Sequence, residues 1–97
     1  MEVRDNPEER RYELVDDGQL VGEILYRSDP GRVVLVHTEV SPALEGQGLA
    51  SRLVAGALDD IRARGLRVVP ICPFVRSYLR RHPEYDDLVV TKPQVTG

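Results

Sequence analysis

The chain carries a single cysteine, at a position where a thiol could be reactive. Cys72 closes the apolar segment that begins at Leu66, and the next residue, Pro73, favours the first turn of a helix. A helix N-terminus stabilises a thiolate, so Cys72 could act as a nucleophile or as a proton donor. An inert buried thiol is the alternative, because free cysteine is among the most buried residue types.

A second candidate pair lies in the segment His37-Thr38-Glu39-Val40. Alternate side chains of a strand point to the same face, so His37 and Glu39 share one face. A carboxylate beside an imidazole could take a proton from an ammonium group, directly or through water. His37 is the favoured base because an imidazole titrates nearest neutral pH. A hydrogen-bonded pair with only a structural role is the equal alternative.

The loop Glu45-Gly46-Gln47-Gly48 separates a predicted strand from a predicted helix that begins at Leu49. The first N–H groups of a helix have no partners within it, and neighbouring glycines let a phosphate approach the backbone closely. We therefore expect a pyrophosphate site here, with a plain turn as the alternative. Neither common nucleotide motif fits, because Ser51 replaces the third glycine of the dinucleotide motif and no Gly-Lys-Ser/Thr sequence follows.

The first half of the chain predicts the strands that position these residues. Residues 1–9 are polar and carry little pattern, so we expect a loose terminus. Alternating apolar residues and glycine-containing turns then predict an antiparallel meander of three strands. These strands cover residues 10–15, 19–26 and 32–40.

The second half of the chain predicts helices. An apolar stripe at helical spacing predicts a helix over 49–64, with Gly65 as its C-terminal cap. A strand over 66–72 follows and should lie parallel to the third strand, because a helical crossover joins them. A second helix is expected over 73–82, and a last short strand over 88–91.

Composition limits the classes of function. The chain has 97 residues and a mass of 10.9 kDa, so we expect one domain over residues 1–97. Its net charge of −3 argues against a nucleic-acid partner, and no apolar run is long enough for a membrane span or a signal peptide. One cysteine allows no internal disulfide, which favours a reducing, cytoplasmic setting. The two histidines and the cysteine show no metal-ligand spacing, so we expect no metal site.

At the glycine loop the sequence resembles the GNAT acetyltransferase superfamily. That family begins its main helix with Arg/Gln-x-x-Gly-x-Gly/Ala, and Gly48 and Ala50 match the last two fixed positions. Glu45 departs from the pattern, since it stands where arginine or glutamine is usual. The segments Val40-Ser41-Pro42 and Cys72-Pro73-Phe74 and the short length resemble the family's small YjdJ-type branch. The resemblance covers about residues 10–90.

The resemblance implies a shortened GNAT fold, an α+β structure whose mixed, mostly antiparallel sheet carries two helices. It also implies transfer of an acetyl group from acetyl-CoA to a primary amine of a protein, peptide or small molecule. A non-catalytic CoA-binding module is the alternative. Only Asp16 to Gln19 stand where larger members place two helices that wall the acceptor site, so the acceptor pocket should be shallow and open.

The resemblance further places the ligand. The acetyl group would lie between the third strand and the strand over 66–72, close to Cys72, which could take the acetyl group or protonate the leaving thiolate. Many members use a tyrosine as that acid, but the ungapped match puts Leu79 at its position, and Tyr78 lies one residue, about 100° of helix, away. Tyr78 is therefore an acid candidate whose alternative is packing against the sheet. The residues implied in cofactor binding are Thr38, Val40, Gly46, Gln47, Gly48, Leu49, Ala50 and Ser51.

Overall fold

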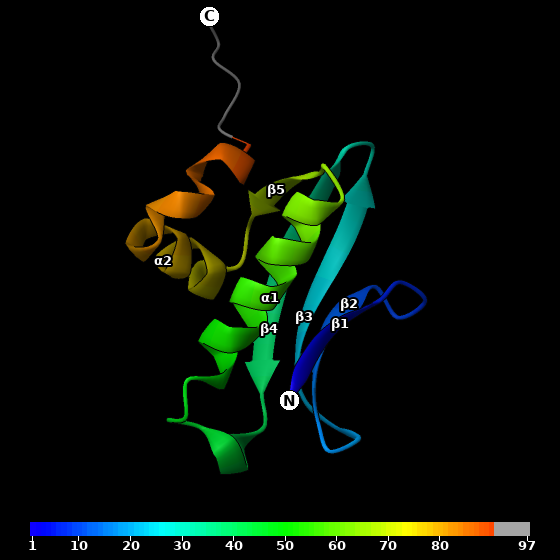
Figure 1. Cartoon of the computed structure of the whole chain (residues 1–97), viewed down its shortest axis with the longest axis vertical. Helices are drawn as coiled ribbons and strands as arrows, with labels where there is room; N and C mark the ends of the chain where they lie inside the picture. The colour runs from blue at the N-terminus through cyan, green and yellow to red at the C-terminus, as the bar shows by residue number, and fades with distance from the viewer. Residues whose placement is uncertain (91–97) are drawn as a thin grey trace, which may run out of the picture.

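The computed structural model describes residues 1–90 of the chain, and one five-stranded sheet forms its centre (Figure 1). The strands are β1 (Glu2–Asn6), β2 (Arg11–Asp16), β3 (Gln19–Asp29), β4 (Arg32–Val40) and β5 (Arg67–Pro70). They lie in chain order across the sheet. Successive strands pair antiparallel, except that β4 and β5 pair parallel. The mixed, mostly antiparallel sheet predicted from the sequence is thus confirmed.

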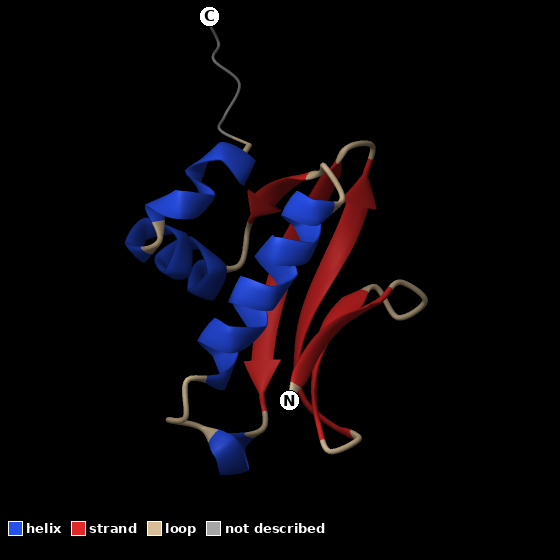
Figure 2. Ribbon diagram, viewed as in Figure 1, coloured by secondary structure: helices blue, strands red, loops and turns tan. Residues whose placement is uncertain are grey.

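Two α-helices, α1 (Leu49–Ala63) and α2 (Pro73–Arg81), complete the core. Figure 2 shows α1 lying across one face of the sheet, with α2 beside it near β5. The predicted apolar stripe of α1 is the buried one, because removing these side chains from water is what holds the helix on the sheet. Its buried residues are Leu49, Leu53, Val54, Ala57, Leu58 and Ile61.

The end of α1 follows the predicted capping. Gly65 has a φ of +71°, which a glycine adopts without strain. Its N–H donates to the Arg62 carbonyl at 3.0 Å, and the N–H of Leu66 donates to the Ile61 carbonyl at 3.1 Å. These bonds satisfy carbonyls that the helix leaves open, and they turn the chain toward β5.

The expected loose terminus over residues 1–9 is wrong, because residues 2–6 form the edge strand β1. All five pair with β2, from Glu2 opposite Val15 to Asn6 opposite Arg11. Asp5 accepts a hydrogen bond from the Tyr26 hydroxyl and forms an ion pair with Arg64 at 2.9 Å. Tertiary contacts therefore form a strand in a segment whose own sequence shows no period.

The expected strand over 88–91 is also wrong in the described part. A 3₁₀ helix, η2 (Pro83–Leu88), ends at Leu88. Val89 then makes a single parallel bridge to Val68, and the Val90 N–H donates to the Val68 carbonyl. Thr91 lies outside the described residues.

One buried carboxylate ties the first two strands together. The Glu13 side chain accepts hydrogen bonds from Arg11 Nε at 2.8 Å, Asn6 Nδ2 at 2.9 Å and Arg4 Nε at 3.1 Å. Burial raises the pKa of this carboxyl, but the hydrogen bonds from Arg11, Asn6 and Arg4 outweigh it, and the net pKa lies below its usual value. Glu13 is therefore a satisfied structural group.

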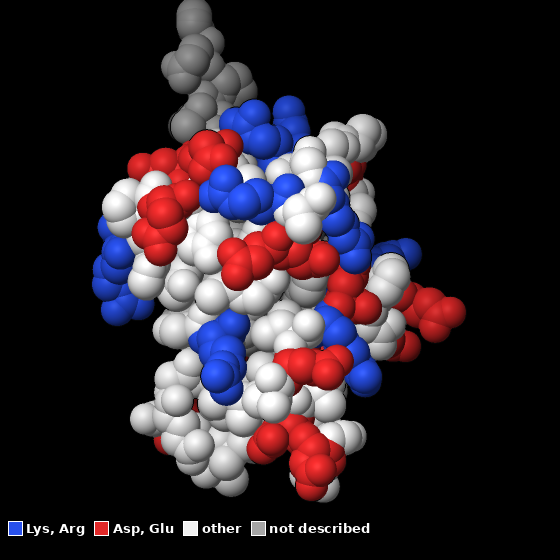
Figure 3. Space-filling view, viewed as in Figure 1, with Lys and Arg blue, Asp and Glu red and all other residues white. Residues whose placement is uncertain are grey.

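The surface over the helices carries both signs of charge, interspersed (Figure 3). Of the helices within residues 1–90, none is long and apolar enough to cross a membrane. In the same part of the chain, His, Cys, Asp and Glu side chains form no group of three that could hold a metal ion.

Candidate functional site

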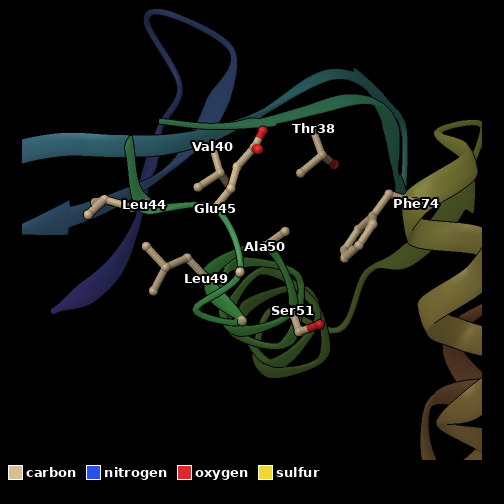
Figure 4. Close-up of a pocket in the computed structure, with 10 residues that line it drawn as sticks. Thr38, Val40, Leu44, Glu45, Leu49, Ala50, Ser51 and Phe74 are labelled. Atoms are coloured by element: carbon tan, nitrogen blue, oxygen red, sulfur yellow. The ribbon is translucent and has the colours of Figure 1, made fainter. Parts of the chain in front are cut away.

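A cavity of about 310 Å³ lies between the end of β4 and the start of α1 (Figure 4). Two separate parts of the chain form most of its wall, and α2 adds one aromatic ring. The lining residues are Thr38, Val40, Leu44, Glu45, Gly46, Gly48, Leu49, Ala50, Ser51 and Phe74. Seven of the eight residues that the resemblance implies in cofactor binding are among them, and Gln47 is not.

Backbone amides face this cavity at the start of α1. Gly46 and Gly48 have φ values of +88° and +73°, a left-handed conformation that favours glycine. Gly48 is the N-cap and offers no side-chain bond to the helix. Among the described residues, the amides of residues 46–51 have no hydrogen-bond acceptor. Free amides and the positive end of the helix dipole together favour an anion.

The strands β4 and β5 diverge beside the same cavity. Their pairing ends at Leu35 opposite Pro70. The Leu35 carbonyl then accepts the N–H groups of both Ile71 and Cys72, at 3.0 and 2.9 Å. Beyond this point β4 keeps its pairing with β3, while within residues 1–90 no strand pairs with its other edge over 36–40. An extended ligand could pair with that edge as an added strand does.

Cys72 lies behind the cavity wall, at the N-cap of α2. Its side chain is buried, with 2% of the residue exposed. Its Sγ lies 3.3 Å from Thr38 Oγ1, and either atom can donate. Thr38 lines the cavity and Cys72 does not. The thiol therefore contacts a residue of the cavity wall, a threonine that the resemblance places among the cofactor-binding residues.

His37 and Glu39 lie on the face of β4 opposite Thr38 and Val40, as strand alternation requires. His37 Nε2 lies 3.3 Å from Glu39 Oε2, and their side chains are 55% and 66% exposed. Glu39 also contributes to a second, open hollow on β3 and β4, and Val40 lines both hollows. The pair is thus accessible, on the side of the sheet away from the glycine loop.

Tyr78 is placed away from the cavity lining. Its ring stacks on His82, with centroids 3.9 Å apart, and lies 6.3 Å from the ring of Tyr85. Burial raises its pKa, and the nearby carboxylates of Glu84 and Asp59 raise it further. The Tyr78 ring thus packs against neighbouring rings, and its role as an acid stays a prediction.

Two lining residues were missed by the sequence analysis. Leu44 belongs to a short 3₁₀ turn, η1 (Pro42–Leu44), and Phe74 lies in the first turn of α2. Phe74 follows a proline that begins a helical turn, and Leu44 lies two residues after another, a signal that could have placed both apolar residues beside the neighbouring loop and thiol.

Diverging parallel strands beside a glycine-rich helix start define a fold that can hold an extended ligand with an anionic group. Residues 11–88 match the family model of the GCN5-related N-acetyltransferases, and the chain belongs to this family. The resemblance to the GNAT superfamily is thereby confirmed.

The comparisons also give individual relatives. The human and mouse proteins named NATD1 are each 34% identical to the chain over 61 residues, which is 62% of the chain and 54% and 56% of those proteins. The chain thus spans about half the length of the curated relatives it matches.

Two solved structures share the fold. A GCN5-like protein of Staphylococcus aureus, solved by NMR, superposes with a TM-score of 0.70 at 25% identity, over 97% of the chain and 92% of that protein. A ribosomal-protein-alanine N-acetyltransferase of Brucella melitensis superposes with a TM-score of 0.56 at 20% identity, over 90% of the chain and 65% of that enzyme. The second likeness shows the fold alone.

Proposed function

We propose that the protein transfers an acetyl group from acetyl-CoA to a primary amine of a protein, peptide or small molecule. The observation that carries this proposal is that two parts of the backbone with free hydrogen-bonding groups in the described chain border the cavity together. The unpartnered amides of residues 46–51 and the unpaired edge of β4 over 36–40 border the same space. One ligand that is anionic at one end and extended at the other fits both.

The fit to CoA follows group by group. The amides from Gly46 to Ser51, including those of Gln47, Leu49 and Ala50, would hold the pyrophosphate. The backbone at Thr38 and Val40 would pair with the pantetheine arm. A Cβ atom added at Gly46 or Gly48 would meet nothing within 4 Å, so the loop leaves room for a phosphate. Glu45 is the one lining group with an unfavourable charge for this ligand.

The amine would approach from the opposite face, where His37 and Glu39 lie. Only Asp17 and Gly18 separate β2 from β3, so no helix stands at that position to wall an acceptor site. Such an open face suits an exposed amine. His37, with Glu39 beside it, would take the proton that the ammonium form must lose before it can attack.

Cys72 lies where the strands diverge and has two possible roles. In one, its sulfur bonds to the acetyl carbon as the coenzyme sulfur leaves, and the amine then displaces Cys72. In the other, the amine attacks the acetyl carbon directly and Cys72 supplies the proton for the leaving thiolate. The single cysteine supports a reducing, cytoplasmic setting for either role.

A screen of amine acceptors with acetyl-CoA, read as release of free thiol, tests the function. Binding is measured separately, by NMR titration with acetyl-CoA. An unchanged spectrum would refute the central claim. Binding without transfer to any acceptor would favour the alternative, a CoA-binding module.

Experiments on Cys72 distinguish an acetyltransferase from a protein that only binds CoA. We expect bound acetyl-CoA to protect the thiol from iodoacetamide, because the acetyl end of the ligand would cover it. Cys72→Ala should keep the affinity for CoA, since it leaves the amides of residues 46–51 intact, and should lower transfer about 100-fold. Cys72→Ser is the matched control for the size of the side chain. A thiol that CoA does not protect, in a protein whose alanine variant transfers at the wild-type rate, would be core packing only.

A further inference from the structure

Thr38 is the lining residue that contacts the Cys72 thiol. The 3.3 Å contact joins two residues that are 34 positions apart in the chain. The hydroxyl belongs to the cavity wall, whereas the thiol is only 2% exposed and lies behind it. The threonine hydroxyl therefore lies between the Cys72 thiol and a ligand in the cavity.

We propose that the Thr38 hydroxyl relays a proton from Cys72 to the sulfur atom that leaves during acetyl transfer, an inference that rests on the proposed function. A hydroxyl accepts one hydrogen bond while it donates another. The Cys72 S–H gives its proton to Thr38 Oγ1 as the Thr38 O–H gives its proton to the departing coenzyme thiolate. Cys72 is left as a thiolate and regains a proton when the acceptor amine loses one, by way of water. The numbers of protons therefore balance over the cycle.

Thr38 suits this role better than the other nearby residues with a hydroxyl group do. Thr38 and Ser51 are the cavity-lining residues with a hydroxyl in the described chain, and Ser51 lies in the first turn of α1. The Tyr78 ring stacks on His82 instead. Threonine is also stiff at χ1, so β4 holds the hydroxyl in few orientations. The relay further selects the second of the two roles of Cys72, that of proton donor.

The first test compares Thr38→Val, which keeps the shape and removes the hydroxyl, with Thr38→Ser, which keeps the hydroxyl. We expect the valine variant to bind acetyl-CoA as the wild type does, because the backbone at Thr38 makes that contact. Its transfer rate should fall about 100-fold, the contribution typical of a positioned acid. Serine should restore most of the rate. Thr38→Ala provides the same comparison if valine alone perturbs folding, which NMR spectra reveal.

The second test is a double-mutant cycle with Cys72→Ala. Residues that act in one relay are not additive, so the double variant should transfer no more slowly than either single variant. Losses that multiply, or a valine variant as fast as the wild type, would overturn the relay and leave the proposed function standing. A wild-type protein that binds acetyl-CoA and acetylates no amine would instead overturn the proposed function, and the relay with it.

The third readout needs no acceptor. If the Thr38 hydroxyl hydrogen-bonds the thiol, iodoacetamide should alkylate Cys72 with a different pH profile in Thr38→Val than in the wild type. Serine should return the wild-type profile. Superimposable profiles for all three proteins would contradict the hydrogen bond on which the relay depends.

Discussion

The glycine at the N-cap of α1 gives the sharpest test of the anion site. Gly48 has a φ of +73° and borders the cavity. We compare Gly48→Asp with Gly48→Asn, because the two side chains have nearly the same shape and both tolerate a left-handed backbone better than other residues do. The pair therefore differs mainly by one negative charge at the helix start. We expect aspartate to weaken CoA binding well beyond the effect of asparagine.

The size of the effect follows from the structure. A Cβ atom at position 48 meets nothing within 4 Å, so neither variant creates a clash. The backbone conformation costs both variants about 1 kcal/mol of folding free energy. For a separation on the order of 5 Å between the carboxylate and a bound pyrophosphate, Coulomb's law gives roughly 1 to 3 kcal/mol of repulsion, depending on the effective dielectric. That energy corresponds to about a 5- to 150-fold difference in Kd between the two variants.

The assay is calorimetric titration of both variants with CoA, at low and at high salt. Salt screens exposed charges, so the difference in Kd should shrink as salt rises. Thermal unfolding of the two variants without ligand provides the control for stability. Equal affinities at low salt would refute the placement of the pyrophosphate at the amides of residues 46–51.

Two further predictions concern single positions. Glu45 lines the cavity, and Figure 4 shows its carboxylate directed toward the end of β4. Glu45→Gln should tighten CoA binding modestly, and Glu45→Arg should tighten it more. Equal values of Kd for CoA at low salt would mean that this side chain turns away from the phosphates. Gly56 faces Val3, whose side chain would lie 2.6 Å from an added Cβ atom. Gly56→Ala should therefore lower the free energy of unfolding by about 1 to 3 kcal/mol in denaturant melts, and Val3→Ala should recover part of the loss. Additive losses in the double variant would contradict that contact.

Local patterns predicted the elements that local physics determines. The spacing of apolar residues from Leu49 to Ile61 gave the buried face of α1, because a helix repeats its faces within a few residues. Gly65 marked the C-terminal cap for the same reason, since the left-handed turn depends on the residue itself. The glycine loop was found because a helix start and its flanking glycines are adjacent in the chain.

The strand β1 shows what such patterns miss. Residues 2–6 contain one strongly apolar side chain, Val3, and no alternation that spans the segment. They pair with the next strand, β2, and their other partners are distant in the chain: Gly56 by close packing, and Arg64 and Tyr26 through Asp5. A strand formed by contacts with residues as much as 59 positions away leaves no local signal.

One half of the candidate site likewise depends on neighbouring residues, and the other half depends on contacts between distant elements. The anion-binding half consists of consecutive backbone amides, so its residue types and spacing could be read directly from the chain. The half that would handle protons consists of side chains from elements that meet only after folding. Thr38 reaches Cys72 because β4 and β5 diverge beyond Leu35, and the Tyr78 ring of α2 lies near the Tyr85 ring of η2. Sequence alone therefore indicates which thiol is available, whereas only the fold indicates which hydroxyl stands between that thiol and the cavity.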